Sequence, residues 1–223
     1  MFCAEEYMHQ LIENLLNSFG DRLYYVGLQG SYMRGDATEN SDIDPMVVID
    51  DLCVDDLDVY KQIIFQMEYP EKSCGFICGM QELRLWNPLE ICQLIHSTKD
   101  YYGCLLDLVP TYTKTDVRNF VLLSVNNLYH EITHRYLHAS MEKNIARITS
   151  SYKNVFFILQ NLHYLETGNF VLTKRELARC LNDGDAEILN TAIALSNGAP
   201  LEFDVAFSLL YRWCQTIMHR LSA

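Results

Sequence analysis

The first half of the chain alternates between helix-like and strand-like hydrophobic patterns. Apolar side chains recur every three or four residues over 4–18, which predicts an amphipathic helix. Two short apolar runs, at 22–28 and 43–49, predict strands, and 56–69 returns to helical spacing after an acidic start that suits a helix N-terminus. The run "PLEICQLIHS" at 88–97 predicts a third strand. This order favours an α+β or α/β domain built on a small mixed sheet.

After Pro110 the pattern becomes helical almost throughout. Segments with helical spacing extend from Asp116 to the last residues. Breaks between them are expected at 168–169, 183–184 and 198–200. The sequence therefore predicts an α+β fold in which a mixed-sheet domain, residues 1–110, precedes an all-α helical bundle, residues 111–223.

The composition and net charge limit the kinds of partner that the protein is expected to bind. The chain has 223 residues, of which 49% are hydrophobic and 21% charged, as in an ordinary globular protein. Its formal net charge is −12. A chain this acidic repels nucleic acid and anionic membrane, and it attracts metal ions and positively charged small substrates. We therefore expect no nucleic-acid partner.

The beginning of the sequence carries acidic residues, Glu5, Glu6 and Glu13, and has no basic n-region or small-residue cleavage site. It does not fit a signal peptide. No apolar run approaches the roughly 18 residues that a membrane-spanning helix needs. We expect a cytoplasmic protein with no membrane partner.

The chemistry-bearing stretch is "GSYMRGDATENSDID", which occupies residues 30–44. Gly30 and Ser31 follow the first predicted strand, where backbone N–H groups and the Ser31 hydroxyl can bind a phosphate, and Gly30 allows close approach. Arg34 adds a charge-assisted donor. This half of the stretch predicts a site for a triphosphate.

Asp42 and Asp44 make up the other half. Residues two apart on a strand point to the same face, so their carboxylates are expected side by side. Two like charges at that distance are costly unless a divalent cation neutralises them. Carboxylates together with substrate phosphates are typical ligands of Mg²⁺.

The Gly-Ser turn, ten intervening residues and "DID" before apolar residues together resemble the signature of the polymerase-β-like nucleotidyltransferases. The layout of sheet domain and helical bundle is similar to that of aminoglycoside and lincosamide nucleotidyltransferases. The resemblance implies that Gly30 and Ser31 hold phosphates of ATP or another NTP, and that Asp42 and Asp44 bind two Mg²⁺ ions. One departure is Pro45, where the family has an apolar residue able to donate a ladder hydrogen bond, and it suggests an edge position or a bulge.

The family pattern also implies a third carboxylate on a neighbouring strand. Glu90 opens the predicted strand at 88–97, and Glu82 lies in the less strand-like "GMQELRLW". We favour Glu90, either as a metal ligand or as a general base on an acceptor hydroxyl.

A rival motif is "HEITH" at 130–134, which fits H-E-x-x-H on a helix. Such a motif places two histidines on one face for Zn²⁺, with Glu131 as general base, and suggests a zinc protease as a remote alternative. The third ligand of the extended motif is missing, because the sequence has Leu137 and Ser140 where Gly and His would be required at 137 and 140. Within a nucleotidyltransferase, Glu131 is instead a candidate acceptor-side base.

A second candidate phosphate contact lies in the bundle. Thr173 and Glu176 have the spacing of a capping box, which predicts a helix beginning after Thr173. Lys174 then stands at the positive end of that helix and is a candidate ligand for the triphosphate.

These patterns predict a Mg²⁺-dependent enzyme that transfers a nucleoside monophosphate from an NTP to a hydroxyl. The acidic charge favours a small cationic acceptor such as an aminoglycoside-like antibiotic. Two alternatives stay open: a protein acceptor of the antitoxin kind, and a nucleotide-binding module without catalysis.

Overall fold

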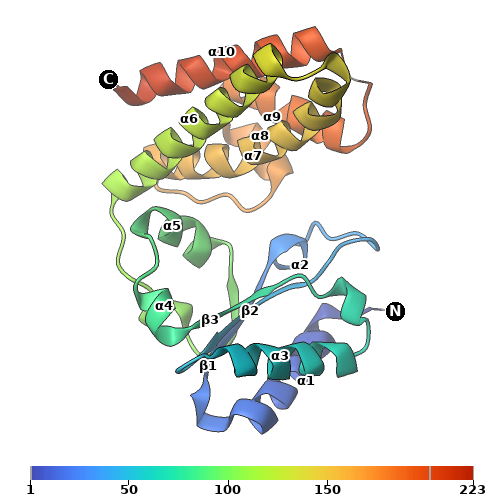
Figure 1. The fold of residues 1–223 in the computed structure, drawn as a ribbon. Helices are drawn as coiled ribbons and strands as arrows, with labels where there is room; N and C mark the ends of the chain where they lie inside the picture. Colours follow the sequence, from blue (N-terminus) through green and yellow to red (C-terminus); the bar gives the residue numbers. More distant parts are fainter. Residues whose placement is uncertain (1, 201, 223) are drawn as a thin grey trace. The chain divides into compact units, whose positions relative to one another are not determined.

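The computed structural model describes residues 2–200 and 202–222. The chain divides into two compact units, Met1–Thr111 and Tyr112–Ala223. The boundary expected from the sequence, between residues 110 and 111, lies beside this division. The two units are described separately below, and Figure 1 shows their elements.

The first unit is built on a four-stranded sheet. Its strands are β1 (Leu23–Gln29), β2 (Asp44–Ile49), β3 (Phe76–Gly79) and β4 (Lys99–Tyr102). Their order in the sheet is β3-β2-β1-β4. β1 pairs antiparallel with both β2 and β4, whereas β2 pairs parallel with β3. The predicted α+β class with a small mixed sheet is confirmed.

Helices cover both faces of the sheet (Figure 1). α1 (Ala4–Phe19) and α3 (Val54–Gln66) bury apolar side chains against one face, where Met8 and Leu11 meet Val47. The other face packs on α4 (Met80–Arg84) through Met46 and Leu83. Because side chains alternate along β2, this second face is also the face of Asp44.

An ion pair joins the start of β1 to α3. Arg22 Nη2 lies 2.6 Å from Asp56 Oδ2, and Arg22 also donates to the Asp50 carbonyl from Nε at 3.2 Å. The Arg22 guanidinium and the Cys53 backbone N–H hold the pKa of Asp56 below its usual range. These contacts fix the end of the sheet that lies away from Asp44.

The prediction of a strand at 88–97 is wrong, because these residues form the helix α5 (Pro88–His96). Asn87 caps this helix by accepting a hydrogen bond from the Leu89 N–H at 3.1 Å. Pro88 occupies the first turn, where its missing N–H costs nothing. The strands that complete the sheet, β3 and β4, have four residues each and were not predicted.

Pro45 lies in β2, which is an interior strand and not an edge. The register of β2 and β3 places Pro45 opposite Gly75, between the bridge at Ile43 and the ladder that begins at Met46. Proline has no N–H to donate, so the parallel ladder is interrupted at this position. A Cβ on Gly75 would lie 1.8 Å from the Pro45 carbonyl oxygen, so the segment that contains Gly75 packs tightly against Pro45.

Short helices complete the first unit. They are α2 (Gly30–Arg34) and the 3₁₀ turns η1 (Gly20–Arg22), η2 (Pro70–Lys72) and η3 (Leu105–Asp107). α2 follows β1 directly, which places the Gly-Ser turn at the end of that strand.

The second unit is helical throughout its described residues. Its helices are α6 (Lys114–His138), α7 (Met141–Thr167), α8 (Lys174–Cys180), α9 (Asp183–Ser196) and α10 (Phe203–Ser222). One core of buried residues joins these helices, including Val125 of α6, Phe156 of α7 and Trp213 of α10. Gly168 ends α7 in the left-handed conformation, as predicted, but residues 183–184 open α9 instead of separating two helices, because Asn182 supplies the cap.

None of the helices in residues 2–200 and 202–222 is long and apolar enough to cross a membrane.

Candidate active site

The pairing of β1 with β2 brings the two halves of the 30–44 signature together. Gln29, the last residue of β1, lies opposite Asp44, the first residue of β2. Gly30 and Ser31 follow Gln29 and begin α2. The Gly-Ser turn and the second aspartate are therefore neighbours in space, although fourteen positions separate Gly30 from Asp44 in sequence.

Gly30 and Asp44 lie so close together that there is no room for a side chain at position 30. A Cβ added to Gly30 would lie 1.8 Å from Asp44 Oδ2 and 2.7 Å from its Cγ. Gly30 also has a φ of +70°, a conformation that side-chain-bearing residues rarely adopt. The site therefore requires glycine at position 30 for two reasons, the absence of a side chain and the backbone conformation. The Asp44 carboxylate lies directly over the turn.

The charges of the signature act on one another. Asp42 is exposed and Asp44 is partly buried. Burial raises the pKa of Asp44, the negative charge of Asp42 raises it further, and the positive charge of Arg34 opposes both effects. Asp42, Asp44 and Arg34 therefore share one electrostatic environment.

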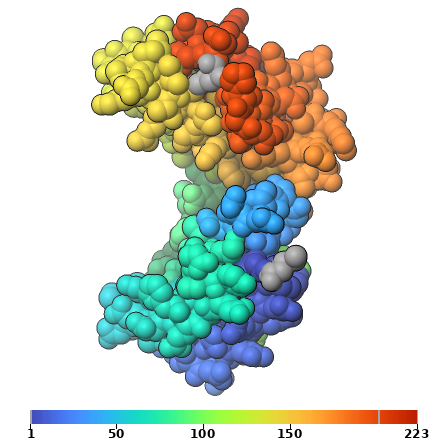
Figure 2. Space-filling view, turned by 90° about the vertical axis from the view of Figure 1, so that its right-hand side faces the viewer, coloured from blue at the N-terminus to red at the C-terminus, as the bar shows by residue number. Residues whose placement is uncertain are grey.

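The loop between the two halves is anchored at both ends. At its start, Arg34 Nε lies 3.3 Å from Asp36 Oδ1. Near its end, Lys72 Nζ donates to the carbonyl oxygens of Glu39 at 2.7 Å and Ser41 at 3.2 Å. Figure 2 shows this loop in light blue at the surface of the first unit.

Ser31 lies at the start of α2 with its side chain partly exposed. Its carbonyl accepts the Asp36 N–H at 3.0 Å, which closes the turn. Within the described residues its hydroxyl makes no hydrogen bond, which leaves it available to a ligand. Ser31 therefore follows β1 at the start of a short helix, as the sequence predicted, and its role as a phosphate ligand stays a prediction.

The residues fit a divalent cation of the Mg²⁺ type. The ligands present are carboxylate oxygens, which hard cations prefer. Burial and the second aspartate disfavour the ionised form of Asp44, and a cation would reverse this cost. No group of three or more His, Cys, Asp or Glu residues in the described part of the chain is arranged to hold a metal ion. The pair thus suits an ion that keeps several waters and takes further ligands from substrate phosphates.

Glu90 does not lie on a strand beside the aspartates, so the structural basis of its prediction is wrong. It belongs to α5, and its Oε2 accepts a hydrogen bond from the Trp86 indole Nε1 at 2.8 Å. Since the described residues hold no three-residue metal group, the triad of Asp42, Asp44 and Glu90 is not formed.

The alternative, Glu82, lies at the wrong end of the sheet. A Cβ on Gly79 would be 1.9 Å from Glu82 Oε2, so the carboxylate sits beside the last residue of β3. Gly79 pairs with Ile49, at the far end of β2 from Asp44. Five residues of extended strand span roughly 16 Å.

Two polar residues of the sheet, Gln29 opposite Asp44 and Asp100 opposite Gly27, were not singled out from the sequence. Gln29 donates from Nε2 to Thr98 Oγ1 at 2.9 Å, which ties the end of β1 to the residue preceding β4. Asp100 of β4 accepts a hydrogen bond from the Tyr25 hydroxyl at 2.6 Å, and the pKa of Tyr25 is raised mainly by burial and then by this carboxylate. A four-residue strand that begins Lys-Asp gives no hydrophobic signal by which Asp100 could have been placed.

The H-E-x-x-H motif lies on α6 in the second unit. The rings of His130 and His134 are 5.9 Å apart, and Glu131 forms an ion pair with Arg135 at 2.8 Å. The motif belongs to no group of three potential ligands among the described residues, so a zinc-protease site is not assembled. The assignment of Glu131 as an acceptor-side base stays a prediction.

Lys174 is the first residue of α8, also in the second unit. Thr173 caps this helix, as predicted: its hydroxyl accepts the Glu176 N–H at 3.2 Å and lies 2.7 Å from Glu176 Oε2. The Lys174 ammonium lies 5.7 Å from the centroid of the Phe156 ring. The assignment of Lys174 as a phosphate ligand stays a prediction.

Comparison with known families identifies the first unit. Residues 10–74 match the family model described as a nucleotidyltransferase domain. The chain carries a nucleotidyltransferase domain. The matched residues contain β1, α2, the signature loop and β2, so the family assignment covers the segment whose geometry is given above. The resemblance to polymerase-β-like nucleotidyltransferases is confirmed, and the chain is an enzyme of the nucleotidyltransferase class.

Solved structures extend the likeness beyond this domain. The crystal structure of spectinomycin adenyltransferase AAD(9) from Enterococcus faecialis, with ATP and spectinomycin, has a TM-score of 0.58 and 16% sequence identity. The match covers 98% of this chain and 99% of that one. At this identity it establishes a shared fold. A toxin–antitoxin structure with AMP-PNP matches 58% of this chain and 93% of its own at 19% identity, with a TM-score of only 0.32. No curated protein matches the sequence significantly.

The raised pKa of Asp44 predicts a gain in stability on neutralisation. Above the pKa of Asp44 in the unfolded chain, its ionised form is less favourable in the folded state, so this charge lowers the free energy of unfolding. Asp44→Asn should therefore raise the urea midpoint at neutral pH in the presence of EDTA. The difference from the wild type should shrink as the pH falls through the raised pKa, because the wild type then becomes neutral as well. A variant less stable than the wild type at neutral pH would contradict the assigned electrostatics.

Proposed function

We propose that the protein transfers a nucleoside monophosphate from an NTP to a hydroxyl group. The observation that carries the proposal is the placement of the Asp44 carboxylate directly against the glycine of the Gly-Ser turn, with Asp42 and Arg34 in the same electrostatic environment. A turn for phosphates and a carboxylate pair for a cation are needed together in such a transfer.

Gly30, Ser31 and Arg34 would bind the phosphates of the donor. Gly30 lets the chain approach without a side chain, and the Ser31 hydroxyl is a donor within the turn. The Arg34 guanidinium, held beside Asp36, supplies positive charge toward the phosphates. These groups would orient the donor so that its α-phosphorus faces the acceptor, and correct orientation alone removes much of the barrier of a bimolecular reaction.

Asp42 and Asp44 would hold Mg²⁺, which when bound neutralises phosphate charge and lowers the pKa of the attacking hydroxyl. The contribution of the chain is to hold the two carboxylates close together, and the bound cation would offset the cost of ionising Asp44 beside Asp42. Lys72 supports this arrangement, because its two hydrogen bonds to backbone carbonyls fix the loop that leads into Asp42. Glu90 and Glu82 are left out of the catalytic set, for the reasons of placement given above.

ATP is the proposed donor. The spectinomycin adenyltransferase, which shares the fold along nearly the whole chain, was crystallised with ATP. The direct test is to incubate the purified protein with Mg²⁺, ATP and a panel of hydroxyl-bearing acceptors, and to measure pyrophosphate release together with the mass shift of the acceptor. Binding of ATP without pyrophosphate release with any acceptor would favour the nucleotide-binding module without catalysis.

The acceptor is proposed to be a small polycation with free hydroxyls, such as an aminoglycoside. The supporting observation is the net charge of −12, which attracts cations and repels nucleic acids. Labelling of a protein acceptor, and of no small cation at millimolar concentration, would overturn this choice without affecting the proposed reaction.

A cationic acceptor predicts a salt dependence. Its KM should rise with ionic strength, because the Debye length falls from roughly 30 Å at 0.01 M to about 8 Å at 0.15 M. An uncharged acceptor with the same hydroxyl groups is the control, and its KM should stay constant over the same range. Equal salt responses of the two acceptors would show that the bulk charge does not guide acceptor binding.

A further inference from the structure

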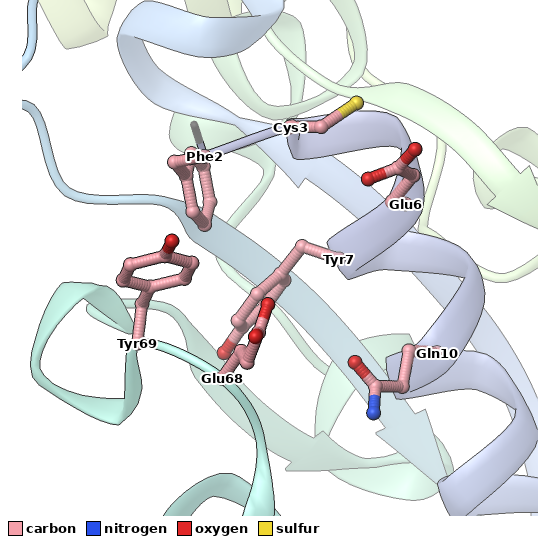
Figure 3. Close-up of a pocket in the computed structure, with 7 residues that line it drawn as sticks. All are labelled: Phe2, Cys3, Glu6, Tyr7, Gln10, Glu68 and Tyr69. Atoms are coloured by element: carbon pink, nitrogen blue, oxygen red, sulfur yellow. The ribbon is translucent and has the colours of Figure 1, made fainter.

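A pocket in the first unit lies between the start of α1 and the segment after α3. It has a volume of about 120 Å³. The residues that carry its chemistry are Phe2, Glu6, Tyr7, Gln10, Glu68 and Tyr69. Figure 3 shows them, with the three aromatic rings gathered on one side and Glu6 and Gln10 projecting from α1. We call this the amino-terminal pocket.

Three aromatic rings form one wall of the amino-terminal pocket. The Phe2 ring centroid lies 5.6 Å from that of Tyr7 and 5.5 Å from that of Tyr69, with the Tyr69 ring edge-on at 84°. Tyr69 adopts φ +60°, which is uncommon for a bulky residue. Rings set at such angles present both faces and edges to the enclosed space, and the faces carry partial negative charge.

Carboxylates supply the charge of the pocket. Glu6 and Glu68 are both exposed, and neither forms an ion pair with any residue that the structure describes. Gln10 adds an amide but no charge. The lining of the amino-terminal pocket is thus aromatic and anionic, with two formal negative charges. Lys72 does not line the pocket, but its Nζ lies 5.6 Å from the centroid of the Phe2 ring and already takes up part of that face.

The hydroxyl of Tyr7 is an unsatisfied polar group at this site. Tyr7 is only 4% exposed, and its hydroxyl is buried without a hydrogen-bond partner. Burial raises the pKa of Tyr7, and a side-chain contact with Ser73, which does not line the pocket, opposes the shift in part. Figure 3 shows the Tyr7 ring extending from α1 on the side of Glu68 and Tyr69. Buried polar groups normally have a partner, which makes this hydroxyl evidence for a ligand.

We propose that the amino-terminal pocket binds a small organic ammonium ion. Aromatic faces attract ammonium groups, carboxylates neutralise them, and a hydroxyl accepts their N–H bonds. An anion would be repelled by Glu6 and Glu68, and a bare metal ion would gain nothing from the aromatic wall. A water molecule occupies roughly 30 Å³ in the liquid, so the volume of about 120 Å³ suits an ammonium head group with a short alkyl chain.

The pocket is separate from the proposed nucleotide site, although one aromatic contact joins them. The Phe2 ring lies 5.3 Å from the ring of Tyr32, which belongs to α2 of the signature. The proposal therefore does not depend on the transfer reaction, and it can be tested in the absence of nucleotide and acceptor.

The test compares n-butylammonium with 1-butanol, a neutral probe of the same chain length, on the full chain at constant ionic strength. Backbone amide NMR signals of Tyr7, Gln10 and Tyr69 should shift saturably with n-butylammonium and stay unchanged with 1-butanol. Equal shifts with both probes, or shifts spread evenly over the acidic surface, would overturn the proposal.

Two variants distinguish binding in the pocket from general attraction by the net charge of the protein. Glu68→Gln should raise the Kd of n-butylammonium about fivefold, the effect of one exposed ion-pair contact. Glu71→Gln makes the same change in net charge three residues away, outside the pocket lining, and should leave the Kd unchanged. Equal effects of the two variants would reduce the binding to general electrostatic attraction and overturn the proposal.

A third variant tests the buried hydroxyl. Tyr7→Phe should weaken binding of n-butylammonium while leaving the urea midpoint unchanged or higher, because it removes a buried group without a partner. An unchanged Kd, or a clear loss of stability, would show that the hydroxyl serves the fold and not a ligand.

Discussion

Asp42→Asn and Asp44→Asn are each expected to lower kcat/KM for nucleotidyl transfer at least ~100-fold, or about 2.7 kcal/mol of transition-state stabilisation. The change removes a ligand charge and keeps the side-chain volume. Both variants should remain folded, and Asp44→Asn should gain stability because it removes a partly buried charge beside Asp42. Activity is measured by pyrophosphate release at saturating Mg²⁺, and folding by far-ultraviolet circular dichroism and urea titration.

Asp50→Asn is the matched control. Asp50 directly follows β2, so the same charge is removed at the opposite end of the strand that Asp44 begins. We expect wild-type activity from this variant. If Asp42→Asn or Asp44→Asn kept most of its activity, or if the control lost as much as they did, the assignment of the carboxylate pair would be wrong.

The Gly-Ser turn and the aspartate pair could be predicted because both are recognised from the spacing of residues within one short segment. "DID" after a ten-residue gap places the aspartates at the start of a strand whose apolar continuation is visible in the sequence. In the structure these two strands pair antiparallel, with Gln29 opposite Asp44. What the spacing could not supply was the contact of the Asp44 carboxylate with Gly30, which depends on the register of the two strands.

Long-range features were predicted less well. The segment 88–96 is apolar and short, and at that length periodicity alone does not separate a buried strand from a helix. Asn87 and Pro88 form the cap and the first turn of the helix, a start signal that the strand prediction did not use. Glu90 was then assigned to the site because of this misplaced strand. The strands actually present, β3 and β4, are recognisable only from their partners β2 and β1.

Glu131 and Lys174 belong to the second unit, and their assignment to the site stays a prediction. Glu131 and Lys174 were attractive because an acid in H-E-x-x-H and a lysine at a helix start have known chemistry. In the structure, Arg135 pairs with Glu131, and Lys174 lies over the Phe156 ring. Both short motifs therefore indicated a local helix correctly.

Gly30→Ala is expected to reduce activity at least ~100-fold while lowering stability by only about 1–2 kcal/mol. The new Cβ would lie 1.8 Å from Asp44 Oδ2, far inside van der Waals contact. The Asp44 side chain can rotate away from the methyl group, so the fold survives while the carboxylate leaves its place. The remaining loss of stability comes from an L-residue held at φ +70°.

Gly35→Ala separates these two effects. Gly35 has φ +75°, nearly the same backbone strain, and a Cβ there would meet nothing within 4 Å. Both variants should therefore show similar urea midpoints, whereas only Gly30→Ala should lose activity and the stabilisation by Mg²⁺ that an intact carboxylate pair confers. Equal activities of the two variants would mean that the position of Asp44 against the turn is unimportant, and the proposed site would have to be abandoned. Because the strain is matched, a difference in activity can be assigned to the displaced carboxylate and not to a weakened fold.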